Sequence, residues 1–267
     1  MIRDMTLGQY YPVKSVIHKL DPRVKLFATF IYIVALFTFR GLAGFALVTA
    51  GLFSVIRISE IPLGYMVKGL KTIMTLLLIT VFFNLFFTKT GTEYWHWGIF
   101  HLTSAGIISA VLMTIRFIYL ILGTSLMTLT TTANALTDGL EKSLACLNRI
   151  HVPVHSLAMM MSIALRFIPI LTEETDRIMK AQMARGADFE SGNLIRRAKN
   201  MLPILIPLFV SAFRRADDLA MAMESRCYTG GEGRTKMKPL KYEKIDRIAY
   251  LAVIVFFILV IVFRIMQ

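Results

Sequence analysis

The chain has 267 residues, of which 56% are hydrophobic, and its 30 Lys and Arg outnumber its 17 Asp and Glu to give a net charge of +13. Soluble domains are nearer about 45–50% apolar, so this composition excludes an ordinary soluble protein and indicates an integral membrane protein. Membranes keep Lys and Arg on the cytoplasmic side, so a large basic part is expected in the cytoplasm. The two cysteines, Cys146 and Cys227, build no disulfide framework.

Charged residues divide the chain into apolar runs, and five of these runs are predicted to be membrane spans. Several are shorter than the roughly 20 residues that cross a bilayer core, but Lys and Arg at their ends can extend toward the interface. The fourth run contains a lone arginine, Arg116. The predicted spans lie within Leu26–Phe39, Gly41–Ile56, Thr72–Thr88, the run from Tyr94 to Thr137, and Ile248–Phe263.

The distribution of positive charge gives the orientation of these spans. With the N-terminus inside, the inner segments 1–25, 57–71 and 134–247 hold 26 of the 30 basic residues. The outer segments hold only three, which are Arg40, Lys89 and Arg264. This asymmetry predicts a cytoplasmic N-terminus, an outer C-terminus, and an outer loop rich in Trp and Tyr between the third and fourth spans.

Two further apolar runs compete for span status. Ile150–Leu165 continues into the charged stretch TEETDRIMKAQMAR, and Asn200–Phe213 continues into RRADDLAMAMESR. A helix that is apolar at one end and charged at the other is typical of an amphipathic helix on or under the membrane. Because short apolar runs are ambiguous by periodicity, six or seven spans remain the alternative.

These assignments predict an all-α membrane protein in three parts. Residues 1–133 form an N-terminal membrane domain of about four spans, residues 134–244 a cytoplasmic domain, and residues 245–267 a C-terminal span. The cytoplasmic domain is expected to begin with an amphipathic helix over 134–150. Two long helices should follow, from His155 to Arg185, with a kink at Pro169, and from Leu202 to Arg226.

An internal repeat lies at the ends of the two long helices. At an offset of 41 residues, Thr175–Gly186 aligns with Ala216–Cys227. A single arginine at a helix C-terminus needs no special explanation, because the helix dipole favours positive charge there. Two arginines in the same frame, each after a small residue and with an alanine one turn earlier, predict two equivalent docking tips. The candidate site residues are Ala181, Ala184, Arg185 and Gly186 in the first copy and Ala222, Ser225 and Arg226 in the second.

The stretches AQMARGAD and AMESRCYTGGEGRT resemble the paired Ala-Arg-Gly-type motifs of the transmembrane T components of energy-coupling factor transporters, the cobalt-transport-Q-like permease family. The second motif departs from that pattern, with Ser225 and Cys227 in place of Ala and Gly. The upstream segment ALRFIPILTEETDRI is also similar, and the resemblance covers most of the chain. It points to the type in which one module is shared among several vitamin transporters.

The resemblance implies a coupling subunit of an importer in the cell membrane. In that family the T subunit joins a small membrane-embedded substrate-binding (S) subunit to two cytoplasmic ABC-type ATPases, here expected to be a heterodimer. Carried over to this chain, Arg185 and Arg226 each dock on one ATPase. The chain itself would be non-catalytic and without a cofactor, in contact with the lipid bilayer, and without a nucleic-acid partner. The substrate would be a vitamin or another micronutrient.

Other chemistry finds little support in the sequence. No G-x-x-x-x-G-K-[ST] motif is present, and Gly230–Thr235 is interpreted as a flexible return loop. His151 and His155 are too few for a metal site, and Pro153 between them argues against a shared helix. Arg116 has either a functional role or a packing role. The rival hypotheses are a conventional ABC permease with a single coupling helix, and a membrane enzyme acting on lipids.

Overall fold

The computed structural model describes residues 10–38, 42–87, 92–97, 100–189, 193, 195, 199–230, 237 and 239–265. The chain divides into two compact units. We call the described residues of 10–139 and 240–265 the bundle unit, and those of 140–239 the arm unit. Each unit is described by itself below.

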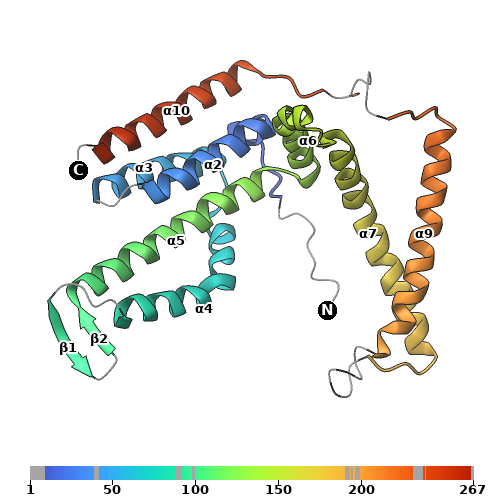
Figure 1. Ribbon diagram of the computed structural model, residues 1–267, viewed down its shortest axis with the longest axis horizontal. Coiled ribbons are helices and arrows are strands. Elements are labelled where there is room, and N and C mark those ends of the chain that lie inside the picture. Colours follow the sequence, from blue (N-terminus) through green and yellow to red (C-terminus); the bar gives the residue numbers. More distant parts are fainter. Residues whose placement is uncertain are drawn as a thin grey trace. The chain divides into compact units, whose positions relative to one another are not determined.

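Each of the five predicted spans forms a helix of the bundle unit. Helix α5 packs against α2, α3 and α4, while α10 packs against α2 and α3 (Figure 1). The short helix α1 precedes these, and α6 begins where the unit ends. The helices are α1 (Val16–Lys19), α2 (Pro22–Thr38), α3 (Leu42–Ser59), α4 (Leu63–Phe87), α5 (Ser104–Thr130), α6 (Ala133–Ser143) and α10 (Lys244–Ile265).

The fourth predicted run, from Tyr94 to Thr137, is wrong at its start. An antiparallel hairpin occupies that part, formed by β1 (Glu93–Trp97) and β2 (Phe100–Thr103), with Glu93 opposite Thr103. The aromatic-rich loop expected there is therefore largely paired backbone. Helix α5 begins only at Ser104, where the Thr103 hydroxyl caps it by accepting the N–H of Gly106. Apart from this hairpin, the described elements are helical, as predicted for an all-α membrane protein.

Among the described residues, three helices are long and apolar enough to cross a membrane: α5, α10 and, in the arm unit, α7 (Val154–Ala184). Shorter apolar helices cover Gly44–Ser59 and Ile73–Phe87. The alternative with additional spans requires α7 to cross the membrane, and α7 is long and apolar enough to do so. The second half of α7 carries the charged stretch noted above, on which the amphipathic interpretation is based.

Two tyrosines, Tyr32 and Tyr119, link three helices of the bundle unit. The Tyr32 hydroxyl donates to the carbonyl of Tyr119 at 2.9 Å, and the Tyr119 hydroxyl shares a 2.7 Å hydrogen bond with Thr49. The Tyr32 ring passes so close to Gly123 that a Cβ there would lie 2.3 Å from the ring edge. These contacts join α2, α3 and α5, and satisfy the hydroxyl groups of Tyr32, Tyr119 and Thr49 between the helices.

The arm unit contains the second part of α6, a 3₁₀ helix η2 (Leu144–Ile150), α7, and α9 (Leu202–Glu224). The amphipathic helix expected over 134–150 is thus divided at Leu144. The long helices begin and end within two residues of the predicted bounds, and α7 continues through Pro169. The imidazole Nδ1 of His155 lies 2.9 Å from the Glu141 carboxylate, which ties the start of α7 to α6.

Candidate functional site

Helix α7 ends in a Schellman motif built around Arg185. The N–H of Ala187 donates to the carbonyl of Gln182 at 3.0 Å, and the N–H of Gly186 donates to that of Met183 at 2.9 Å. Gly186 has φ +88°, the left-handed conformation that this motif requires and that glycine adopts without steric cost. The motif ends the helix sharply, with Arg185 on its last turn.

Helix α9 ends in the same motif one repeat later. The N–H of Tyr228 donates to the carbonyl of Met223 at 3.0 Å, and the N–H of Cys227 donates to that of Glu224 at 2.8 Å. Cys227 adopts φ +56°, where the first copy has glycine. An L-residue in this conformation costs about 1–2 kcal/mol, so the second tip keeps its geometry despite an unfavourable residue.

The two arginines therefore stand in matching backbone settings. The N–H of Arg185 donates to Gln182 at 3.0 Å, and that of Arg226 donates to Met223 at 3.1 Å. Each of the three main-chain hydrogen bonds at the end of α7 has an equivalent at the end of α9, at the same offset of 41 residues as in the sequence repeat. The repeat is thus one of main-chain geometry as well as of sequence.

The residues at both tips are exposed. Within the described residues, neither the Arg185 nor the Arg226 guanidinium forms an ion pair. Each guanidinium keeps its fork of five N–H donors for a partner, in a form suited to bidentate binding of a carboxylate. The predicted site residues are all exposed: Ala181, Ala184, Arg185, Gly186, Ala222, Ser225 and Arg226.

Helices α7 and α9 run in opposite directions and pack against each other at an angle (Figure 1). Near the end of α7, the Gln182 amide donates to the carbonyl of Pro203 at the start of α9, at 3.5 Å. At the opposite end, the Tyr228 hydroxyl donates to the Met159 sulfur at 3.1 Å. The antiparallel arrangement places Arg185 at one end of the helix pair and Arg226 at the other.

An ion pair between Glu174 and Arg215 lies between the tips, with an Nη2–Oε2 distance of 3.3 Å. These two residues are themselves equivalent in the 41-residue repeat. Arg185 follows Glu174 by 11 residues, and Arg226 follows Arg215 by the same number. At 1.5 Å per residue, each arginine lies about 16 Å along its helix from the ion pair, and the two lie in opposite directions because the helices are antiparallel.

The other candidates do not assemble into sites. His151 caps η2 in a left-handed conformation and His155 lies in α7, and no group of three or more potential metal ligands occurs among the described residues. The Arg116 guanidinium carbon lies 5.7 Å from the Phe37 ring and 5.8 Å from the Phe45 ring, which favours the packing role. Of the return loop, Gly230 is described, and residues 231–235 lie outside the described part.

The contacts between α7 and α9 were not part of the sequence-based prediction. The Glu174–Arg215 contact could have been predicted from the sequence, because opposite charges occupy equivalent positions of the two copies. The contacts of Tyr228 and of Gln182 carry no such signal, since each pairs a polar group with a sulfur or a carbonyl that many other residues could supply.

Comparison with known proteins agrees with the sequence motifs. The model of the cobalt transport protein family (CbiQ) matches residues 13–237. The energy-coupling factor transporter transmembrane protein EcfT of Clostridium kluyveri is 53% identical over 266 residues, which cover 99% of this chain and 98% of that protein. The proteins of the same name from Acidaminococcus fermentans and Bacillus subtilis are 49% identical over 264 residues (99% and 98% covered) and 44% identical over 255 residues (96% of each).

Proposed function

This chain belongs to the cobalt transport protein (CbiQ) family, and we propose that its arm unit couples two cytoplasmic ATPases to a substrate-binding membrane subunit. The chain is a transmembrane component of an energy-coupling factor transporter. The finer assignments, which are the ATPase contacts, the S subunit and the uptake of vitamins or related micronutrients, are part of the proposal. So is the non-catalytic role, in which ATP hydrolysis belongs to the partners.

The observation that carries the proposal is the pair of matching tips. Arg185 and Arg226 have the same main-chain hydrogen bonds, the same exposure, and equal spacing from the Glu174–Arg215 ion pair. Two like partners, side by side, present two equivalent binding sites related by an approximate two-fold axis. A helix pair with the same approximate symmetry can contact both with one tip each. A conventional permease with a single coupling helix has no use for this duplication.

The chemistry of the tips fits docking on a protein surface with acidic groups. A guanidinium whose donors are unoccupied gains charge-assisted hydrogen bonds when it enters a desolvated groove lined by carboxylates or carbonyls. Small neighbours such as Ala184 and Ser225 leave room for the partner surface to approach the last turn. The rigid helices behind the tips then transmit any displacement along their length.

The proposal places the arm unit in the cytoplasm. Three helix ends meet in the bundle unit: the N-terminal ends of α2 and α10 and the C-terminal end of α5. Asp246 accepts a hydrogen bond from the backbone of Asp21, and Lys25 donates one to the backbone of Thr130. These three ends should therefore lie at one face of the membrane. The distribution of basic residues supports a cytoplasmic position for that face.

Co-purification tests the function. The chain, tagged and extracted in mild detergent from its native membrane, should bring down two ATPases and at least one separate small membrane protein. Recovery of ATPases without a small membrane protein would favour a conventional permease. Recovery of neither would contradict the coupling function.

A further inference from the structure

Helix α10 has one buried face and one exposed face. The buried face contains Asp246, which is 2% exposed, and Val260, which is fully buried. The opposite face is exposed and apolar, and its residues Ile248 and Leu251 are each 67% exposed. Because α10 is long and apolar enough to cross a membrane, this face is expected to contact the acyl chains of lipids.

The exposed face of α10 is basic at its start. Arg247 follows Lys244 by about one turn, and Leu251 follows Arg247 by another, so the three share one side of the helix. Lys241 lies three residues before the helix begins. We call Lys241, Lys244 and Arg247 the basic cluster. All three are exposed, and within the described part of the chain none forms an ion pair.

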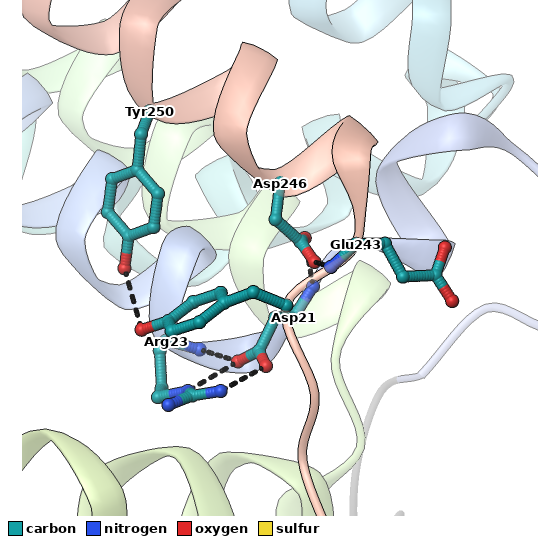
Figure 2. Close-up of polar contacts among 6 residues, drawn as sticks. Asp21, Arg23, Glu243, Asp246 and Tyr250 are labelled. Carbon is teal, nitrogen blue, oxygen red and sulfur yellow. Dashed lines mark hydrogen bonds and ion pairs between the residues drawn. The ribbon is translucent and has the colours of Figure 1, made fainter.

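The two acidic residues next to the basic cluster do not neutralise it. The Asp246 carboxylate points toward the start of α2, where one oxygen accepts the N–H of Asp21 and the other that of Glu243, at 2.8 Å each (Figure 2). The Glu243 side chain extends away from this contact (Figure 2) and forms no ion pair among the described residues. The cluster therefore keeps a surplus of positive charge at the surface.

Helix electrostatics do not explain cations at this position. The N-terminal end of a helix carries partial positive charge, so Lys244 and Arg247 are unfavourable in the first turn of α10. A negative group beside them would offset both this interaction and the repulsion between the cations. The group that fits is an anionic phospholipid, because its phosphate can lie beside the cations while its acyl chains follow Ile248 and Leu251. A soluble anion would leave this apolar face unused.

A tyrosine beside the basic cluster also suits the level of lipid headgroups. Tyr242 is 47% exposed, and tyrosine is enriched where a membrane meets water. The Arg23 guanidinium carbon lies 3.8 Å from the centre of the Tyr242 ring, which holds the ring in place. The same guanidinium donates two hydrogen bonds to Asp21, at 3.0 and 2.8 Å. The chain before α10 is thereby fixed at the level where headgroups are expected.

We propose that Lys241, Lys244 and Arg247 bind the phosphate of an anionic phospholipid whose acyl chains lie along the exposed face of α10. The ammonium and guanidinium groups donate charge-assisted hydrogen bonds to the phosphate oxygens. The site lies wholly within the bundle unit, so it does not depend on the proposed ATPase contacts. A lipid bound here holds the start of α10 at the membrane surface.

The test measures lipid preference close to the basic cluster by quenching of tryptophan fluorescence in vesicles that contain the full-length chain. Trp95→Phe and Trp97→Phe remove the native tryptophans, and Leu251→Trp introduces one reporter a turn beyond Arg247. The quenchers are phosphatidylglycerol and phosphatidylcholine with brominated acyl chains, each mixed with its unbrominated counterpart of the other headgroup. The ratio of quenching gives the relative affinity for the anionic lipid. A separate reporter, Leu78→Trp, is the positional control, because Leu78 is a 60% exposed residue of α4.

The site predicts that phosphatidylglycerol is preferred by about threefold or more at Leu251→Trp, because basic side chains near the surface attract anionic lipids, and is not preferred at Leu78→Trp. Lys244→Gln with Arg247→Gln should abolish the preference. The matched control, Lys244→Arg with Arg247→Lys, keeps both charges and should retain it. Both positions are exposed, so neither pair of changes should prevent folding. No preference at Leu251→Trp, an equal preference at both reporters, or an unchanged preference in the glutamine variant would overturn the site.

Discussion

Glu174 and Arg215 occupy equivalent positions of the two arm repeats, and their side chains form an ion pair across the antiparallel helices at 3.3 Å. Because the repeat relates Glu174 to Arg215, the ion pair lies close to the approximate two-fold axis that relates the two copies. The two arginine tips are then equally far from it along their helices. This relationship shows that the repeat is one of spatial arrangement as well as of sequence.

Exchanging the two charges tests this contact. Glu174→Arg and Arg215→Glu each place like charges opposite one another and should lower the melting temperature of the purified chain. The side chains are 27% and 39% exposed, so each loss should be modest, about 0.5–1 kcal/mol. The double exchange should recover most of the loss. Additive losses in the double variant would show that the two residues do not interact.

The left-handed residues of the tips should respond in opposite directions to substitution. Cys227→Gly removes an unfavourable conformation and should stabilise the last turn of α9 by up to about 1 kcal/mol, whereas Gly186→Ala should destabilise that of α7 by about 1 kcal/mol. Hydrogen exchange of the Tyr228 and Ala187 amides measures each effect. If hydrogen exchange became slower at both tips, or faster at both tips, the result would contradict a shared Schellman motif.

Much of the arm unit could be predicted from sequence. The long helices were assigned within two residues because apolar periodicity and terminal arginines marked them, and the repeat identified both tips. The hairpin before α5 was missed because Trp and Tyr are common both in interfacial loops and in strands. The break at Leu144 was missed because Leu136, Leu140, Leu144 and Leu147 keep a helical spacing from α6 into the 3₁₀ helix.

Long-range contacts could not be predicted. Nothing in the sequence connects Asp21 with Asp246 across 225 residues, since either acid alone is an ordinary residue at the start of a helix. The motif at Cys227 was also hidden, because cysteine is a poor choice for a left-handed residue. Its detection depended on the hydrogen bonds of its neighbours.

The packing of α5 on α2 gives a sharp prediction for a single glycine. Gly123→Ala would place a methyl group 2.3 Å from the Tyr32 ring, and the ring cannot move without losing its bond to Tyr119. We expect a loss of about 1–3 kcal/mol, measured as a lower melting temperature in detergent. The matched control is Gly64→Ala in α4, where the added methyl group meets nothing within 4 Å. Equal effects at both positions would contradict the described packing.

Topology can be tested by labelling intact cells with a membrane-impermeant thiol reagent. Thr92→Cys, next to the hairpin, should be modified from outside, whereas native Cys146 and Cys227, both exposed in the arm unit, should react only after lysis. Gly91 and Ser191, which the predicted topology places outside and inside the cell, lie outside the described residues. Labelling of Cys146 or Cys227 in intact cells would contradict a cytoplasmic arm.

The most direct test of the coupling role compares ATPase retention by four variants in a quantitative pull-down. Arg185→Ala and Arg226→Ala should each weaken retention partially, because the other tip still binds its ATPase, and the double variant should lose both ATPases. Arg177→Ala with Arg214→Ala, two exposed arginines on the same helices, removes equal charge and should retain both. If the arginines only stabilised helix ends, each change would cost about 0.3–1 kcal/mol and no partner would be lost. A double tip variant that still retains both ATPases would contradict the account.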